Sequence, residues 1–156
     1  MLQDAGPWFL TWALYVRAVL AVRRGQADHA IALMRESLTR VLKLHDKFAF
    51  VYALVPLAAA AVLKGDDAWV ARILGARDAV TERTGVTVSD KSVQDLRSHA
   101  EHEARARLGP DRFAIAYAAG RTSSIEALLN DIDAAARRPR LAKRPMREPG
   151  RPPTYL

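Results

Sequence analysis

The residues that could do chemistry in this chain are few, and the densest group lies between positions 95 and 103. Asp95, His99, His102 and Glu103 recur at spacings of three and four residues, so on a helix they would share neighbouring surface, as metal ligands do. The second histidine of a His-Glu-x-x-His motif is absent. The same surface is the polar side of an amphipathic helix, opposite Val93, Leu96, Ala100, Ala104 and Leu108. A solvated polar face explains the group better, and we assign no metal and no cofactor.

Two further groups invite a catalytic interpretation. Ser123 and Ser124 carry nucleophilic hydroxyls, but no histidine lies near them in sequence to act as a base. Ser123 with Glu126 instead fits a capping box at a helix start. Asp66 and Asp67 resemble paired carboxylates, yet at the start of a helix they more simply complement its dipole. No glycine is followed by Lys-Ser or Lys-Thr, so a phosphate-binding loop is absent and we expect no enzyme.

The elements that must position these groups are helices arranged as a repeat. Gly25-Gln26-Ala27-Asp28 precedes the apolar segment 30–34, and Gly65-Asp66-Asp67-Ala68 precedes 70–74, so the glycine and the apolar positions are displaced by the same offset. Each glycine ends one apolar helix, and the next segment starts another. A fixed period of about 40 residues is typical of arrays of helical hairpins, whose units bury their faces against neighbours.

Hydrophobic periodicity predicts about seven helices and no strand. The uncharged stretch 48–63 has 16 residues, fewer than the roughly 20 of a membrane-crossing helix, and contains Pro56, so we interpret it as a buried core helix. Ser89 or Asp90 can cap the fifth helix, and Gly120 should end the sixth. The expected ranges are 7–24, 27–45, 48–64, 67–84, 89–108, 110–120 and from 123 onward.

Composition divides the chain into a nearly neutral body and a basic tail. Residues 137–156 hold seven Lys or Arg residues against Glu148 alone, which gives +6 of the total +7. We predict a helical repeat domain over 1–136 and a disordered Arg/Pro-rich tail over 137–156. The chain has no cysteine and no basic cluster before its first apolar run, which fits a cytoplasmic protein without a secretory signal.

Two stretches, 65–76 and 108–127, carry a Gly-Asp turn, an Ala-Arg-x-Leu-Gly-Ala run and a late Gly-Arg-x-Ser. They resemble the C-terminal tetratricopeptide-like region of actinobacterial STAND-type ATPase regulators, the large LuxR-family and cyclase-linked predicted ATPases. The resemblance implies an all-α, right-handed tetratricopeptide-like array of antiparallel helical hairpins. The residues that fall on the family pattern are Gly65, Asp66, Ala71, Arg72, Leu74, Gly75, Gly120, Arg121 and Ser123.

The departures from this family limit what the resemblance implies. The nucleotide-binding loop is absent, and Arg/Pro-rich sequence stands where DNA-binding helices would follow. ATP hydrolysis and sequence-specific DNA reading therefore do not carry over. We expect a non-catalytic protein-interaction or effector-sensing module of a signalling or transcriptional regulator, encoded alone or left by truncation.

The candidate partner-binding residues are Trp8, Trp12 and Tyr15 on the first helix. Core packing would account for about two of these three aromatic residues. However, this helix is apolar almost all round and has no earlier repeat to cover it, whereas terminal repeats normally carry a polar outer face. An uncovered apolar helix implies a missing domain, a bound partner or self-association, and a homodimer through this helix is the simplest closed solution.

The alternative function is non-specific binding of nucleic acid through the tail. Its basic residues would contact phosphates, but Tyr155 is its only aromatic residue for base stacking, and a merely solubilising end fits equally well. The residues that would make these contacts are Arg137, Arg138, Arg140, Lys143 and Arg144.

The salt dependence of DNA binding, with a deletion variant, distinguishes binding by the tail from binding by the helical body. If the tail binds phosphates, fluorescence anisotropy with labelled DNA should show weak, sequence-insensitive binding that falls steeply as salt rises, because counterions are released on binding. Deleting residues 137–156 should abolish it. Binding that survives the deletion would place the contact on the helices, whose charge of +1 gives no reason to expect it.

Overall fold

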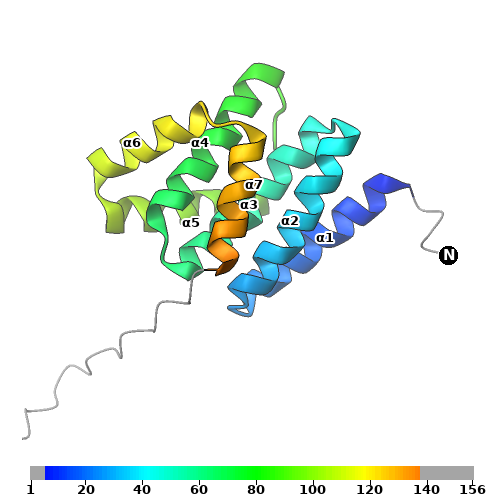
Figure 1. The fold of residues 1–156 in the computed structure, drawn as a ribbon, viewed down its shortest axis with the longest axis horizontal. Helices are drawn as coiled ribbons and strands as arrows, with labels where there is room; N and C mark the ends of the chain where they lie inside the picture. The colour runs from blue at the N-terminus through cyan, green and yellow to red at the C-terminus, as the bar shows by residue number, and fades with distance from the viewer. Residues whose placement is uncertain (1–5, 138–156) are drawn as a thin grey trace, which may run out of the picture.

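The computed structural model describes residues 6–137, which form seven helices and no strand (Figure 1). The predicted all-α fold is confirmed: the first six helices begin and end within two residues of their expected bounds, and the seventh, for which only a start was expected, begins two residues later than expected. The tail residues from 138 onward, predicted to be disordered, lie outside the described range. The helices are α1 (Pro7–Arg23), α2 (Ala27–Leu44), α3 (Lys47–Lys64), α4 (Asp67–Thr84), α5 (Lys91–Leu108), α6 (Pro110–Arg121) and α7 (Ile125–Arg137).

The turns after α1, α2 and α3 are evenly spaced along the chain and share one hydrogen-bond pattern. Gly25, His45 and Gly65 lie in the left-handed region, with φ of 70°, 52° and 75°. The repeat seen between the two glycines therefore consists of two equal units, each made of one helix and its turn. The middle turn has His45 in place of glycine, so the spacing of the glycines alone does not reveal it. In each turn, the residue after the left-handed one donates its backbone N–H to the carbonyl five positions earlier, as in a Schellman motif. The three bonds run from Gln26 to Ala21, from Asp46 to Val41 and from Asp66 to Ala61.

Aspartates start three of the helices. The Asp46 side chain accepts a hydrogen bond from the backbone N–H of Ala49 at 3.0 Å, and Asp66 accepts one from Trp69 at 3.1 Å. Asp90, one of the two predicted caps of α5, accepts from the N–H of Ser92 at 2.8 Å. These bonds satisfy backbone donors that the first helical turn leaves without a partner.

The central helix of the fold is α3, which contacts α1, α2, α4 and α5. It continues through Pro56, a residue that is itself buried. By length and composition α3 is apolar enough to cross a membrane, but 67% of it is buried inside the fold. This burial agrees with the core helix expected from the sequence.

The most extensive contact between any two helices joins α4 to α6, not α5 to α6. Gly75 of α4 and Gly120 of α6 are responsible. A Cβ on Gly75 would overlap the backbone oxygen of Tyr117, and a Cβ on Gly120 would overlap that of Arg72. The sequence interpretation of Gly120 as the end of α6 is wrong, because the helix continues to Arg121 and the glycine is a backbone contact point.

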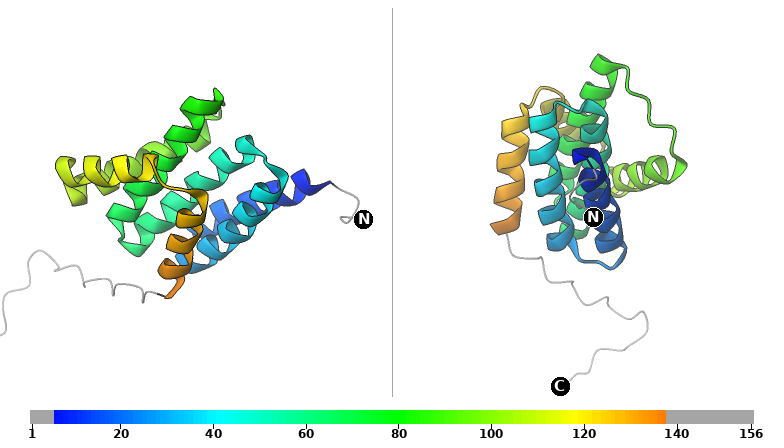
Figure 2. Two further views of the ribbon diagram at one scale, coloured as in Figure 1. Left: turned by 45° about the horizontal axis from the view of Figure 1, so that its top comes forward. Right: turned by 90° about the vertical axis from the view of Figure 1, so that its right-hand side faces the viewer.

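The last helix, α7, folds back against α2 (Figures 1 and 2). Leu128, Ile132 and Ala135 are buried, and Arg35 of α2 forms an ion pair with Asp133. The predicted capping box of Ser123 with Glu126 is not formed. Ser124 is the cap instead, since its hydroxyl accepts from the N–H of Ala127 at 3.1 Å, while Ser123 donates to the carbonyl of Ala119.

The α4–α6 contact predicts that two Gly→Ala changes destabilise the protein, although this substitution usually stabilises a helix. In an ordinary helix interior this substitution stabilises by about 1 kcal/mol. Gly75→Ala and Gly120→Ala should instead each lower the free energy of unfolding by about 3 kcal/mol in urea titrations, because backbone must move apart. Gly6→Ala is the control, since a Cβ there meets nothing within 4 Å. A stabilised Gly75→Ala variant would contradict the close contact.

Candidate interaction surface

The outward side of α1 is an uncovered apolar stripe. Trp8, Trp12, Val16 and Leu20 recur every four residues, so they lie along one side of the helix, and all four are exposed. The opposite side, with Leu14, Ala18 and Ala21, is buried in the core. Among the described helices α1 packs chiefly against α2 and α3, which leaves much of this stripe open to solvent.

The three predicted partner-binding residues differ in burial. Trp8 is 63% exposed and Trp12 is 40% exposed, whereas Tyr15 is 9% exposed. The expectation that about two of the three belong to the core is therefore wrong, because only Tyr15 does. Average burial frequencies describe residues with neighbours on all sides, whereas α1 packs chiefly against α2 and α3 within the described chain.

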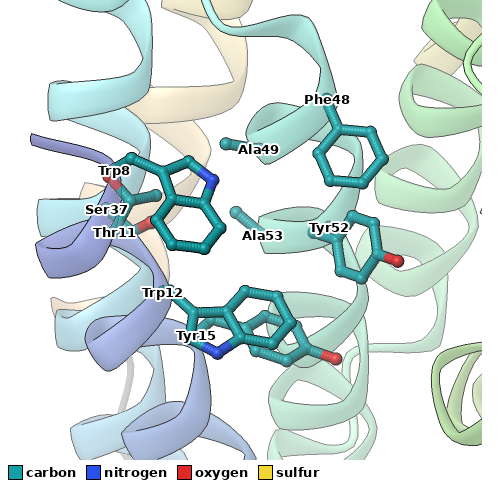
Figure 3. Close-up of a pocket in the computed structure, with 9 residues that line it drawn as sticks. All are labelled: Trp8, Thr11, Trp12, Tyr15, Ser37, Phe48, Ala49, Tyr52 and Ala53. Atoms are coloured by element: carbon teal, nitrogen blue, oxygen red, sulfur yellow. The ribbon is translucent and has the colours of Figure 1, made fainter. Parts of the chain in front are cut away.

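The aromatic side chains form a continuous stack across α1 and α3 (Figure 3). Trp8 and Trp12 are nearly parallel, with ring centroids 6.4 Å apart and an interplanar angle of 4°, and Trp12 stacks on Tyr15 at 5.2 Å. Tyr52 of α3 meets both Trp12 and Tyr15 edge-on, and its ring lies 4.8 Å from Phe48. We call Trp8, Trp12, Tyr15, Phe48 and Tyr52 the aromatic surface.

Phe48 and Tyr52 were not identified from the sequence, although a signal for them exists. They follow Trp8 and Trp12 at the same offset that separates the two glycine turns of the repeat. The aromatic surface therefore consists of equivalent positions in two successive hairpins. Repeat position, rather than composition, is the feature that identifies these residues.

A small hollow of about 40 Å³ opens within the aromatic surface, between Trp8 and Phe48 (Figure 3). This volume holds one or two groups of the size of a water molecule. Ser37 of α2 lines the hollow, is fully buried, and has no hydrogen-bond partner for its hydroxyl within residues 6–137. A buried hydroxyl without a partner is costly, so the hollow offers one polar contact inside an apolar rim.

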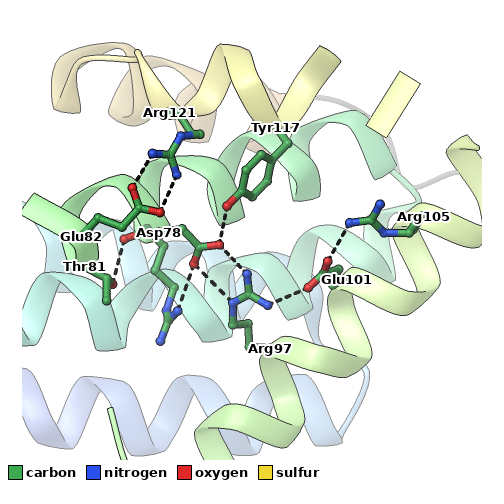
Figure 4. A network of polar contacts seen from close by, with 9 residues as sticks. Asp78, Thr81, Glu82, Arg97, Glu101, Arg105, Tyr117 and Arg121 are labelled. Atoms are coloured by element: carbon green, nitrogen blue, oxygen red, sulfur yellow. Dashed lines mark hydrogen bonds and ion pairs between the residues drawn. The ribbon is translucent and has the colours of Figure 1, made fainter. Parts of the chain in front are cut away.

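A second cluster of functional side chains joins α4, α5 and α6 (Figure 4). The carboxylate of Asp78 accepts hydrogen bonds from Arg97, from Arg77 at 3.2 Å and from the Tyr117 hydroxyl at 2.6 Å. Arg97 also donates to Glu101 at 2.6 Å. Burial, and then the bond to Asp78, raises the pKa of Tyr117. These hydrogen bonds join residues of α4, α5 and α6, so the cluster fastens the three helices together.

The candidate metal ligands of α5 do not converge. Asp95 pairs with Lys91 at 3.1 Å, and Glu103 pairs with Arg107 at 3.8 Å. His99 and His102 are exposed. Over residues 6–137, no group of three or more His, Cys, Asp or Glu side chains could hold a metal ion.

The remaining candidate residues have simple positions. Asp67, one of the two adjacent carboxylates, lies beside Arg107 at 3.2 Å, although burial raises its pKa. Arg137 is the last residue of α7 and donates to the carbonyl of Asp133. The other candidate nucleic-acid residues, Arg138, Arg140, Lys143 and Arg144, lie outside the described range.

The aromatic surface predicts an unusual tyrosine titration. Burial, with a smaller contribution from Asp90, raises the pKa of Tyr15 to about 12. Because the folded protein holds this proton more tightly than the unfolded chain, the associated stability is complete below pH 10 and is lost as the pH rises from 10 towards 12. Absorbance at 295 nm should show a late component, and Tyr15→Phe should remove the part of it that titrates near pH 12. Complete ionisation of all tyrosines near pH 10 in the folded protein would contradict this burial.

The comparisons with known proteins leave this geometry as the main guide to function. No family model, no curated protein and no solved structure matches the chain.

Proposed function

We propose that this protein is a non-catalytic interaction module that docks a protein partner on the aromatic surface. The observation that carries the proposal is the exposure of Trp8 and Trp12 in a preformed stack with Tyr15 and Tyr52. Tryptophan and tyrosine dominate binding energy at protein interfaces. Rings already held by stacking lose little conformational entropy when a partner binds, so their burial is converted efficiently into affinity.

The occupant we propose is a second copy of the chain. The stripe on α1 is aromatic at one end, with Trp8 and Trp12, and aliphatic at the other, with Val16 and Leu20. A two-fold axis through the middle of the stripe would lay the aromatic end of one copy on the aliphatic end of the other. Such an isologous pairing covers the same patch on both subunits and closes after two copies.

The wider context we propose comes from the sequence. The resemblance to the helical region of STAND-type regulators, with its right-handed tetratricopeptide-like array, supports a role in a cytoplasmic signalling or transcriptional regulator. The evenly spaced turns support the array part of this proposal. Binding of nucleic acid through the basic tail stays the alternative function.

The proposed dimer predicts that substitutions on α1 convert the protein to a monomer. Trp8→Gln combined with Trp12→Gln should give a folded monomer in light scattering at protein concentrations where the parent chain is a dimer. Each lost tryptophan should weaken association by about 2 kcal/mol or more. Helical circular dichroism should be unchanged, because both side chains lie outside the core.

Ile115→Gln provides the matched control. Ile115 is an apolar residue on α6 that is 72% exposed and lies outside the aromatic surface. This variant should keep the parent's dimer affinity. A parent chain that stays monomeric at high concentration, or a dimer lost only in Ile115→Gln, would overturn the proposed mode of association.

A further inference from the structure

We propose that a second site, separate from the aromatic surface, binds a small organic anion with an apolar tail, such as a medium-chain carboxylate. The site is a hollow of about 380 Å³ where α2 ends, α3 begins, α4 ends and α7 begins. These four helix ends lie together at the top of Figure 1. Its volume falls within the range of small-molecule pockets, and its lining shares no residue with the aromatic surface. The inference therefore does not depend on the proposed dimer.

The interior of this hollow is apolar. Val41 of α2 and Phe50 of α3 are 2% and 5% exposed, and both contribute to its walls. Leu42 of α2, Val80 of α4 and Ile125 of α7, which are partly buried, complete the apolar lining. An alkyl or aryl tail in this space would gain the ordinary free energy of removing apolar surface from water.

Basic side chains, among them the cations Lys47 and Arg83, line the mouth of the hollow. His45, Lys47 and Arg83 line it and are exposed, and within the described chain none of their side chains has a hydrogen-bond or ion-pair partner. Asp46 is the one acidic residue of the lining, and its carboxylate is engaged as the cap of α3. By contrast, Arg35, Arg72 and Arg107 are all paired with carboxylates. The lining therefore holds two cations, Lys47 and Arg83, against the single carboxylate of Asp46, and within residues 6–137 neither cation is paired with a carboxylate.

The simplest competing explanation is that Arg83 only complements the negative end of the α4 dipole. It accounts for one cation but not for Lys47, which stands at the start of α3, where positive charge is unfavourable. The apolar walls and the cations at the mouth together indicate the class of ligand. A bare inorganic anion would leave the apolar walls wet, and a neutral hydrocarbon would leave the cations unused, whereas a carboxylate with a tail satisfies both.

Octanoate is the probe, with 1-octanol and acetate as comparators. In ¹H–¹⁵N correlation spectra of the full chain, octanoate should shift the amide signals of Phe50, Val80 and Ile125 with saturable binding. Octanol has the same tail without the charge and should bind about tenfold more weakly. Acetate has the charge without the tail and should cause no saturable shift.

The double variant Lys47→Gln with Arg83→Gln isolates the role of charge. Its affinity for octanoate should fall about tenfold, to the level of octanol, while its affinity for octanol stays unchanged. Lys43→Gln is the matched control, because Lys43 is an exposed cation near the end of α2 that does not line the hollow. Unchanged thermal melting of both proteins would show that they are folded.

Three results would overturn the inference. The first is no saturable shift with octanoate, and the second is equal affinity of the parent chain for octanoate and octanol. The third is a set of octanoate-induced shifts that map to Trp8, Trp12 and Tyr52 instead. That last pattern would show the aromatic surface taking the tail and would leave the cationic hollow without a ligand.

Discussion

The direct backbone contact between α4 and α6 determines the second half of the fold. With hydrogen atoms at Gly75 and Gly120 in place of side chains, α6 lies against α4 and makes little contact with α5. Tyr117 is thereby brought to Asp78, which also holds Arg97 of α5. Because α6 crosses α4, the chain leaves it in a position from which α7 returns to α2. The first residue of α7 then forms one wall of the cationic hollow, so that hollow depends on two glycines that do not line it.

The first half of the fold depends on repetition. Four consecutive helices, α2 to α5, have 18 residues each, and the first three turns close with the same pair of backbone hydrogen bonds. Equivalent positions of successive hairpins therefore face the same way. Trp8 and Phe48 are one such pair, and Trp12 and Tyr52 are another, which explains why these four rings lie together with Tyr15 in the aromatic surface.

Local signals determine what the sequence alone can predict. Helix bounds were predictable because apolar periodicity, capping aspartates and left-handed glycines act within a few residues of one another. The role of Gly120 was not, since a glycine at a helix end and a glycine at a helix crossing look identical until the partner helix is known. Ser123 and Ser124 are adjacent, and either could cap the helix that follows. Only the start of α7 at Ile125 decides that Ser124 is the cap. The exposure of Trp8 depends on which helices pack beside α1, and no property of the residue itself encodes that.

The equal spacing of the turns has a consequence for how this architecture can grow. Turns 25 and 65 fall at one end of the helices, and turns 45 and 85 fall at the other, because successive helices alternate in direction. Duplication of a two-helix segment would keep each later turn at its present end of the helices and would extend the aromatic surface by another pair of positions. Duplication of a single helix with its turn, such as α3 with the turn at Gly65, would invert every later helix and carry Arg83 to the opposite end from His45. Tandem growth in steps of two helices is thus the only kind that leaves both surfaces in register.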